Sequence, residues 1–155
     1  MKKILLILSF LRSSRKTIDE AIQLAKEKKA ELLVFFVLDI EYADRIVDKL
    51  TDEGWISGKP TEQLYNSLLK EYKIQAENIV AEIEARAAQL NIPVRSVIRR
   101  GTVLDETLRI TDLEEPDLIV VTRRKRSGLS RLIFGSLVKT LQKHVDCEVK
   151  IIDEE

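Results

Sequence analysis

The chain has 155 residues, the usual size of one domain, so residues 1–155 are expected to form a single domain and not a multidomain assembly. Its 26 basic and 26 acidic side chains cancel, which excludes a global attraction to nucleic acid or to an anionic membrane. With 45% hydrophobic and 34% charged residues, the composition indicates a folded protein with an ionised surface and excludes a disordered chain.

Runs of aliphatic and β-branched residues alternate with segments of helical period, which is typical of a parallel sheet covered by helices on both faces. The first and fourth runs are apolar throughout, so these two strands are expected near the centre of the sheet. The fold class is therefore α/β and Rossmann-like. The five predicted strands are residues 3–9, 31–38, 94–99, 117–122 and 148–152.

The first strand follows two lysines and could imitate a secretory signal. Its apolar run is short and gives way to Arg12, Arg15 and Lys16 without a small-residue cleavage site, so we interpret it as a buried strand. No apolar run approaches the roughly 20 residues that cross a bilayer, and no membrane association is expected. The single cysteine, Cys147, cannot form a disulfide within the chain, which fits a reducing compartment and predicts a cytoplasmic location.

The first helix is predicted after the first strand, with apolar positions on one face of residues 18–25. Thr17, with Glu20 three residues later, is expected to cap it as a capping box. Later in the chain, Thr102 is placed to cap a helix after the third strand, and a last helix is predicted over residues 136–144.

A longer excursion follows the second strand. A short helix is predicted around residues 43–50 and a long one over residues 64–90, with chain breakers between them. At 1.5 Å per residue the long helix would reach about 40 Å, more than the sheet needs, so its first turns are expected to overhang the core. The overhang makes residues 41–70 a candidate surface for a protein partner, and Trp55 either covers the long helix or contacts that partner.

The loop after the fourth strand is strongly basic. Doubly wound sheets bind ligands at the carboxyl ends of their strands, where this loop lies. Residues 122–131 contain five basic side chains and no acid, and Gly135 and Ser136 open the last helix. Unpaired backbone N–H groups of a helix start attract phosphate, while the same pattern also fits a solvated loop with an ordinary helix cap. The loop is thus either an anion site or a charged surface, and RNA or another polyanion is the least favoured occupant.

Six stretches of the chain carry a family resemblance: residues 3–9, 33–39, 101–103, 117–122, 127–136 and 144–149. Together they resemble the universal stress protein family, within the adenine nucleotide alpha hydrolase-like superfamily. The resemblance implies a five-stranded parallel sheet of order 3-2-1-4-5, a homodimer formed through the last strand and a cytoplasmic role in stress survival. For the dimer, residues 148–152 are expected to pair across a two-fold axis.

Many members of that family bind ATP or AMP through a Gly, two residues, a second Gly, nine residues, and then Gly with Ser or Thr. Matched to this chain, Gly135 and Ser136 are retained, whereas the earlier glycines fall on Thr122 and Lys125, and the family's Asp after the first strand falls on Ser9. The ATP-binding motif is therefore degenerate. The family also contains a branch without this motif, and the departures place the chain nearer to that branch.

These departures have opposite physical effects. Side chains at Thr122 and Lys125 stand where glycine would bring backbone close to phosphate, and a positive φ would be strained at Thr122. Lys125 can instead neutralise phosphate, and Ser9 removes a negative charge that magnesium would otherwise shield.

No enzymatic activity is expected, because the sequence lacks a nucleophile elbow, a His partner for Ser or Cys, a metal cluster and a complete P-loop. The ATP pyrophosphatases, related by architecture, carry a Gly-rich loop after the first strand, where residues 9–14 here contain neither glycine nor aspartate. Asp39 and Glu41 form a carboxylate pair that is more typical of a solvated turn than of a metal site.

The predicted function is a non-enzymatic, dimeric binding or interaction protein of the stress response. The alternative is a switch that binds ATP or AMP, with Mg, through the loop of residues 122–136. In that alternative Val37 would frame the adenine through its backbone. The residues assigned to the nucleotide are Ser9, Val37, Thr122, Lys125, Gly135 and Ser136.

Overall fold

The computed structural model describes residues 1–54, 62–124 and 136–154. A five-stranded, wholly parallel sheet of order β3-β2-β1-β4-β5 forms its centre, which confirms the predicted fold class and strand order. Each predicted strand is found, with ends that differ by two residues or fewer. The strands are β1 (Lys3–Leu8), β2 (Glu31–Asp39), β3 (Val94–Gly101), β4 (Leu118–Arg123) and β5 (Glu148–Asp153).

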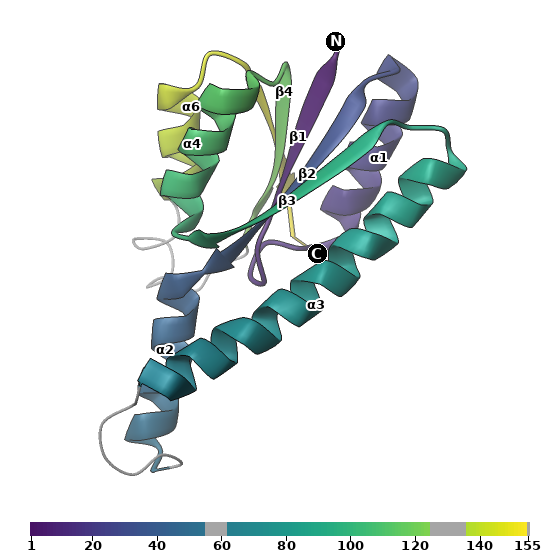
Figure 1. Cartoon of the computed structure of the whole chain (residues 1–155). Helices are drawn as coiled ribbons and strands as arrows, with labels where there is room; N and C mark the ends of the chain where they lie inside the picture. Colours follow the sequence, from purple (N-terminus) through teal and green to yellow (C-terminus); the bar gives the residue numbers. More distant parts are fainter. Residues whose placement is uncertain (55–61, 125–135, 155) are drawn as a thin grey trace.

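Helices cover both faces of the sheet (Figure 1). One face packs against α1 and α3 and the other against α4 and α6, while α2 lies beyond the end of β2. None of the helices in the described ranges is long and apolar enough to cross a membrane. The helices are α1 (Arg15–Lys28), α2 (Ile40–Asp52), α3 (Glu62–Gln89), α4 (Val103–Glu114) and α6 (Ser136–His144).

Alternation along the buried strands divides the core into two layers. In β1, Leu6 and Leu8 face α1 and α3, whereas Leu5 and Ile7 face α4 and α6. All four side chains are fully buried, as expected of a central strand in a doubly covered sheet. The two layers hold the carboxyl ends of β1 and β4 side by side, which is where the chain's winding direction reverses.

The start of α1 differs from the prediction. Ser14, and not Thr17, is the N-cap residue, and its side chain accepts a hydrogen bond from the backbone N–H of Thr17 at 3.1 Å. Thr17 lies inside the first turn of the helix and is fully buried. The predicted capping box was therefore wrong, because the Thr17 side chain is used for a contact with β4 and not for the cap.

The excursion after β2 matches the prediction of an overhang. The 28 residues of α3 span about 42 Å at 1.5 Å per residue, and its first turns extend beyond the sheet to pack against α2 (Figure 1). Tyr65 of α3 donates a hydrogen bond to the carbonyl of Ile40 in α2, at 3.4 Å. Trp55 lies outside the described residues.

A cluster of charges ties the amino ends of the strands together. The Glu114 carboxylate, at the end of α4, accepts hydrogen bonds from Lys3 Nζ at 3.0 Å and from the Arg95 guanidinium, which also contacts Glu31 at 3.2 Å. These bonds, first those from Arg95 and then that from Lys3, lower the pKa of Glu114 from 4.5 to about 2. Glu114 is therefore expected to stabilise the fold only while it is ionised.

Glu114→Gln is expected to lower the free energy of unfolding at neutral pH by about 1 kcal/mol, a modest figure because Arg95 is half exposed to solvent. Since the folded pKa is depressed, the contribution is complete above pH 4.5 and is lost as the pH falls towards 2. Urea denaturation from neutral to acidic pH measures it. The exposed neighbour Glu115→Gln is the matched control, and an unchanged acid profile in Glu114→Gln would contradict the assignment.

Candidate functional site

A cleft of about 310 Å³ lies at the carboxyl ends of the strands, beside the reversal point between β1 and β4. Its polar wall is built by residues that follow four different strands, so only the folded sheet brings them together. These residues are Ser9 and Arg12 after β1, Asp39 at the end of β2, Thr102 after β3 and Arg124 after β4. Apolar contacts come from Leu11, Val103, Leu104 and Leu137.

A tight turn after β1 fixes the position of Arg12. The backbone N–H of Arg12 donates to the carbonyl of Ser9 at 2.9 Å, and the N–H of Ser9 donates to the carbonyl of Arg12 at 3.3 Å. Phe10, inside the turn, packs its ring against Phe36 of β2 and Tyr72 of α3, with ring centroids 5.1 Å and 4.7 Å apart. The turn is thus anchored in the core, and this fixes the backbone position of Arg12.

A buried chain of hydrogen bonds links this turn to β4. The Arg12 guanidinium donates from Nη1 to the carbonyl oxygen of Thr122 at 2.7 Å. The Thr122 hydroxyl donates to Thr17 Oγ1 at 2.7 Å, and Thr17 Oγ1 shares a further bond of 2.7 Å with the hydroxyl of Ser14. Segments more than a hundred residues apart are therefore held together at the edge of the cleft.

The charges of the cleft are separated in space. Arg12, only 5% exposed, and Arg124 lie on the wall formed by β1 and β4. Glu41 and Asp105 are exposed at the side formed by β2 and α4. Asp39 caps α2 by accepting the backbone N–H of Glu41 at 3.0 Å. Burial raises the pKa of Asp39, and this backbone bond partly opposes the rise.

The described residues contain no group of three or more His, Cys, Asp or Glu side chains that could hold a metal ion. The predicted carboxylate pair of Asp39 and Glu41 lies at the start of α2. Asp39 is the N-cap residue of this helix and is half-buried. The cleft therefore offers an anion a cationic wall and a hydrogen-bonding hydroxyl, with carboxylates confined to its opposite side.

The six predicted nucleotide residues have different locations. Ser9 lines the cleft and is 1% exposed. Val37 is fully buried with its side chain in the layer under α4 and α6, one residue beyond the last β1–β2 pair. Thr122 lies in β4 and directs its hydroxyl to Thr17, and it is not among the residues with positive φ, so the strain considered for it does not arise.

For the remaining predicted residues, Lys125 and Gly135 lie outside the described part of the chain. Ser136 is the first residue of α6, as predicted, and its side chain is likewise not described. Arg12 was not predicted. Its sequence signal is an arginine in the turn directly after the central buried strand, which places a cation at the reversal point of the sheet.

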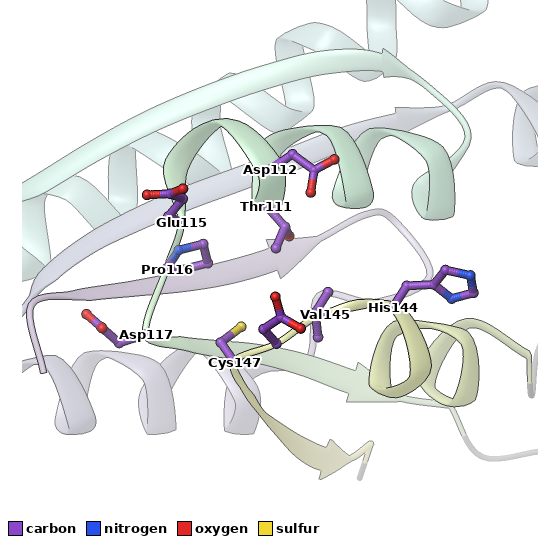
Figure 2. Close-up of a pocket in the computed structure, with 9 residues that line it drawn as sticks. Thr111, Asp112, Glu115, Pro116, Asp117, His144, Val145 and Cys147 are labelled. Atoms are coloured by element: carbon purple, nitrogen blue, oxygen red, sulfur yellow. The ribbon is translucent and has the colours of Figure 1, made fainter.

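A second hollow, of about 450 Å³, lies at the opposite end of the sheet (Figure 2). The end of α4 and the starts of β4 and β5 supply Asp112, Glu115, Asp117 and Cys147 to its lining. Asp117 is committed to the fold, since its carboxylate accepts the backbone N–H groups of Lys2 and Lys3 at 2.8 and 2.9 Å. Although this hollow is larger than the cleft, its carboxylates would repel a phosphate.

Cys147 in the second hollow is expected to react slowly with alkylating reagents at neutral pH. Burial raises the pKa of its thiol above 9.0, and the charges of Asp117 and Asp146 add to the effect, so little thiolate is present. Alkylation by iodoacetamide followed by mass spectrometry should therefore be slower for the folded protein than for the urea-unfolded chain. Equal rates at neutral pH would show that the thiol is not protected.

The sequence matches the model of the universal stress protein family over residues 1–153. A universal stress protein of Bacillus subtilis is 27% identical over 139 residues, which cover 90% of each chain. One from Methanocaldococcus jannaschii is 24% identical over 132 residues, which cover 85% of this chain and 70% of that protein. These matches confirm the resemblance seen in the sequence.

Solved structures share the same fold. The universal stress protein UspA from Lactobacillus plantarum superposes with a TM-score of 0.71 at 20% identity, covering 97% of each chain. A universal stress protein family protein from Arabidopsis thaliana with AMP bound gives a TM-score of 0.58 at 14% identity, covering all of this chain and 93% of that one. Another was solved in complex with cAMP, with a TM-score of 0.63 at 17% identity over 99% of this chain and 98% of that one.

Proposed function

The chain belongs to the universal stress protein family, and from this membership we propose that it is a non-enzymatic binding protein of the stress response in the cytoplasm. One observation supports the absence of catalysis. The cleft contains the hydroxyl of Ser9, but the sequence has a single histidine, His144, which lines the hollow at the other end of the sheet. Ser9 therefore has no imidazole base within reach.

An assay of nucleotide turnover tests this proposal. Incubation of the purified protein with ATP and Mg is expected to release no more ADP, AMP or phosphate than buffer alone, as measured by chromatography. Turnover that follows the protein through a final purification step and is altered by Ser9→Ala would overturn the non-enzymatic assignment.

The position of the cleft favours a second function, the binding of an adenine nucleotide. The cleft occupies the reversal point at which doubly wound sheets bind nucleotides, and its β1–β4 wall is cationic. Relatives of the same fold carry AMP, cAMP and dAMP in their structures. We propose AMP or ATP as the ligand of the cleft, with Ser9 among its contacts. That the other five residues also contact the nucleotide stays a prediction.

Two measurements test nucleotide binding. The supernatant of the denatured, freshly purified protein is expected to contain a co-purified adenine nucleotide, identified by mass spectrometry. Adding AMP or ATP at about 100 times its dissociation constant is expected to stabilise the fold by roughly 2.7 kcal/mol, which a thermal-shift titration detects. No co-purified nucleotide and no shift with either nucleotide, up to millimolar concentrations and with or without Mg, would remove this function.

The last strand supports a proposed homodimer. Within the described part of the single chain, β5 pairs with β4 along one edge and has no strand partner along the other. A second β5 related by a two-fold axis would protect that edge. Light scattering is expected to give twice the chain mass of 17.8 kDa at micromolar concentration, and a single species of 17.8 kDa would contradict the dimer.

A further inference from the structure

Arg12 is a buried cation at a ligand cleft. It is 5% exposed, its backbone is fixed by the turn with Ser9, and its guanidinium is held by the carbonyl of Thr122 at 2.7 Å. Because the fold has already removed this charge from bulk water, an anion that reaches it interacts through a medium of lower dielectric than at an exposed side chain. Its fixed position also reduces the entropy lost when a ligand binds.

The chemistry of the guanidinium fits a phosphate. Its five N–H donors lie in a planar fork, so one guanidinium can bond a backbone carbonyl and also donate to phosphate oxygens. Arg124, two residues beyond Thr122, lines the same wall. With Glu41 and Asp105 exposed at the other side of the cleft, the separation of charge directs the anionic end of a ligand towards β1 and β4.

A magnesium ion does not fit this wall. Mg²⁺ bound together with nucleotide phosphates usually takes one or two carboxylates as ligands. On the β1–β4 wall the described side chains are the hydroxyl of Ser9 and the guanidinium groups of Arg12 and Arg124. Asp39 is at the end of β2, on the far side of β1 from β4, and its carboxylate is engaged in capping α2. The described side chains of the β1–β4 wall therefore supply positive charge for a phosphate and no carboxylate ligand for Mg²⁺.

We infer that Arg12 is the residue that recognises the phosphate of the bound nucleotide, and that it replaces a divalent cation as the phosphate's countercharge. The inference rests on the proposed nucleotide-binding function of the cleft. It assigns a specificity-determining role to Arg12: the cleft selects nucleoside monophosphates over nucleosides and does so without Mg.

Isothermal titration calorimetry on the full chain, with AMP and adenosine as probes, tests the inference. The dissociation constant of AMP is expected to be the same in excess EDTA and in MgCl2. Adenosine is expected to bind at least about tenfold more weakly than AMP, because it lacks the group that Arg12 contacts. Arg12→Lys keeps the positive charge but loses the planar fork of donors. It is expected to weaken the binding of AMP about tenfold and to leave the binding of adenosine unchanged.

Arg86→Lys is the matched control, since Arg86 pairs with Asp19 between α3 and α1 and does not line the cleft. Unchanged adenosine binding shows that the cleft of Arg12→Lys is intact. If that variant does not fold, two comparisons in the natural protein test the inference. They are the affinity for AMP in EDTA against that in MgCl2, and the affinity for AMP against that for adenosine.

The outcomes separate the two proposals. AMP binding that requires Mg, that is no tighter than adenosine binding, or that a folded Arg12→Lys leaves unchanged would overturn the role of Arg12 while nucleotide binding stands. Failure of AMP, ATP and adenosine to bind under any of these conditions would overturn the nucleotide function itself.

Discussion

Phe36→Ala is expected to lower the free energy of unfolding by about 3–5 kcal/mol, the range typical of a phenylalanine removed from a packed core. Phe36 is fully buried in β2, and its ring forms a T-shaped contact with that of Phe10 at a centroid distance of 5.1 Å. The substitution leaves a cavity between the sheet and α3 and also removes the support of the turn that carries Arg12. Urea denaturation followed by circular dichroism measures the loss.

Phe35→Ala is the matched control for this variant. Phe35 is equally buried and adjacent in β2, but it faces the opposite layer, under α4 and α6. A similar loss of stability is expected in both variants, whereas only Phe36→Ala should speed hydrogen exchange at the backbone amides of Ser9 and Arg12. If the two variants exchange these amides at the same rate, Phe10 is not anchored by Phe36 in the way the ring contacts indicate.

Thr17→Val has the second largest expected effect, a loss of about 1–3 kcal/mol. Valine matches the shape of threonine but removes the hydroxyl that joins Thr122 to Ser14. Because Thr17 and Thr122 are fully buried, the Thr122 hydroxyl would lose this partner where water cannot replace it. The loss of stability therefore comes from the Thr122 hydroxyl, which stays buried without this hydrogen bond.

A double-mutant cycle measures this coupling. Thr17→Val with Thr122→Val is expected to cost less than the sum of the two single changes, since both ends of the bond are removed together. Thr51→Val is the control, because the Thr51 hydroxyl bonds the carbonyl of Val47 at 2.9 Å in a partly exposed part of α2. Strict additivity of the Thr17 and Thr122 changes would show that their hydrogen bond contributes no coupling.

The strands could be predicted from the sequence because their signal is local. The unbroken apolar run of β2 marks a strand buried on both faces, whatever its neighbours are. The start of α1 could not be predicted in the same way. Ser14 and Thr17 are both suitable N-cap residues by composition, and the choice between them depends on Thr122, 105 residues further along the chain.

The candidate site shows the same division. The position of Ser9 beside the cleft could be predicted, because Ser9 follows directly after a strand whose carboxyl end lies at this edge of the sheet. Arg12 was missed, because a charged residue in a loop is most often solvated, and only its bond to the carbonyl of Thr122, 110 residues away, reveals that it is buried. The burial and bonding of a site residue such as Arg12 therefore depend on contacts between distant segments, which a local sequence pattern does not contain.

The two parts of α3 pack against different neighbours, so this one continuous helix is expected to have two regions of different local stability. From Ala76 onward its inward side chains belong to the core, where α3 contacts β2 and β3, whereas its first turns have α2 as their neighbour. Amide protons near Val80 and Ile83 should thus exchange only when the whole domain unfolds, and those near Glu62 through local fraying. The protruding tip is consequently expected to tolerate insertions or shortening that leave the sheet, and the cleft at its carboxyl edge, unchanged.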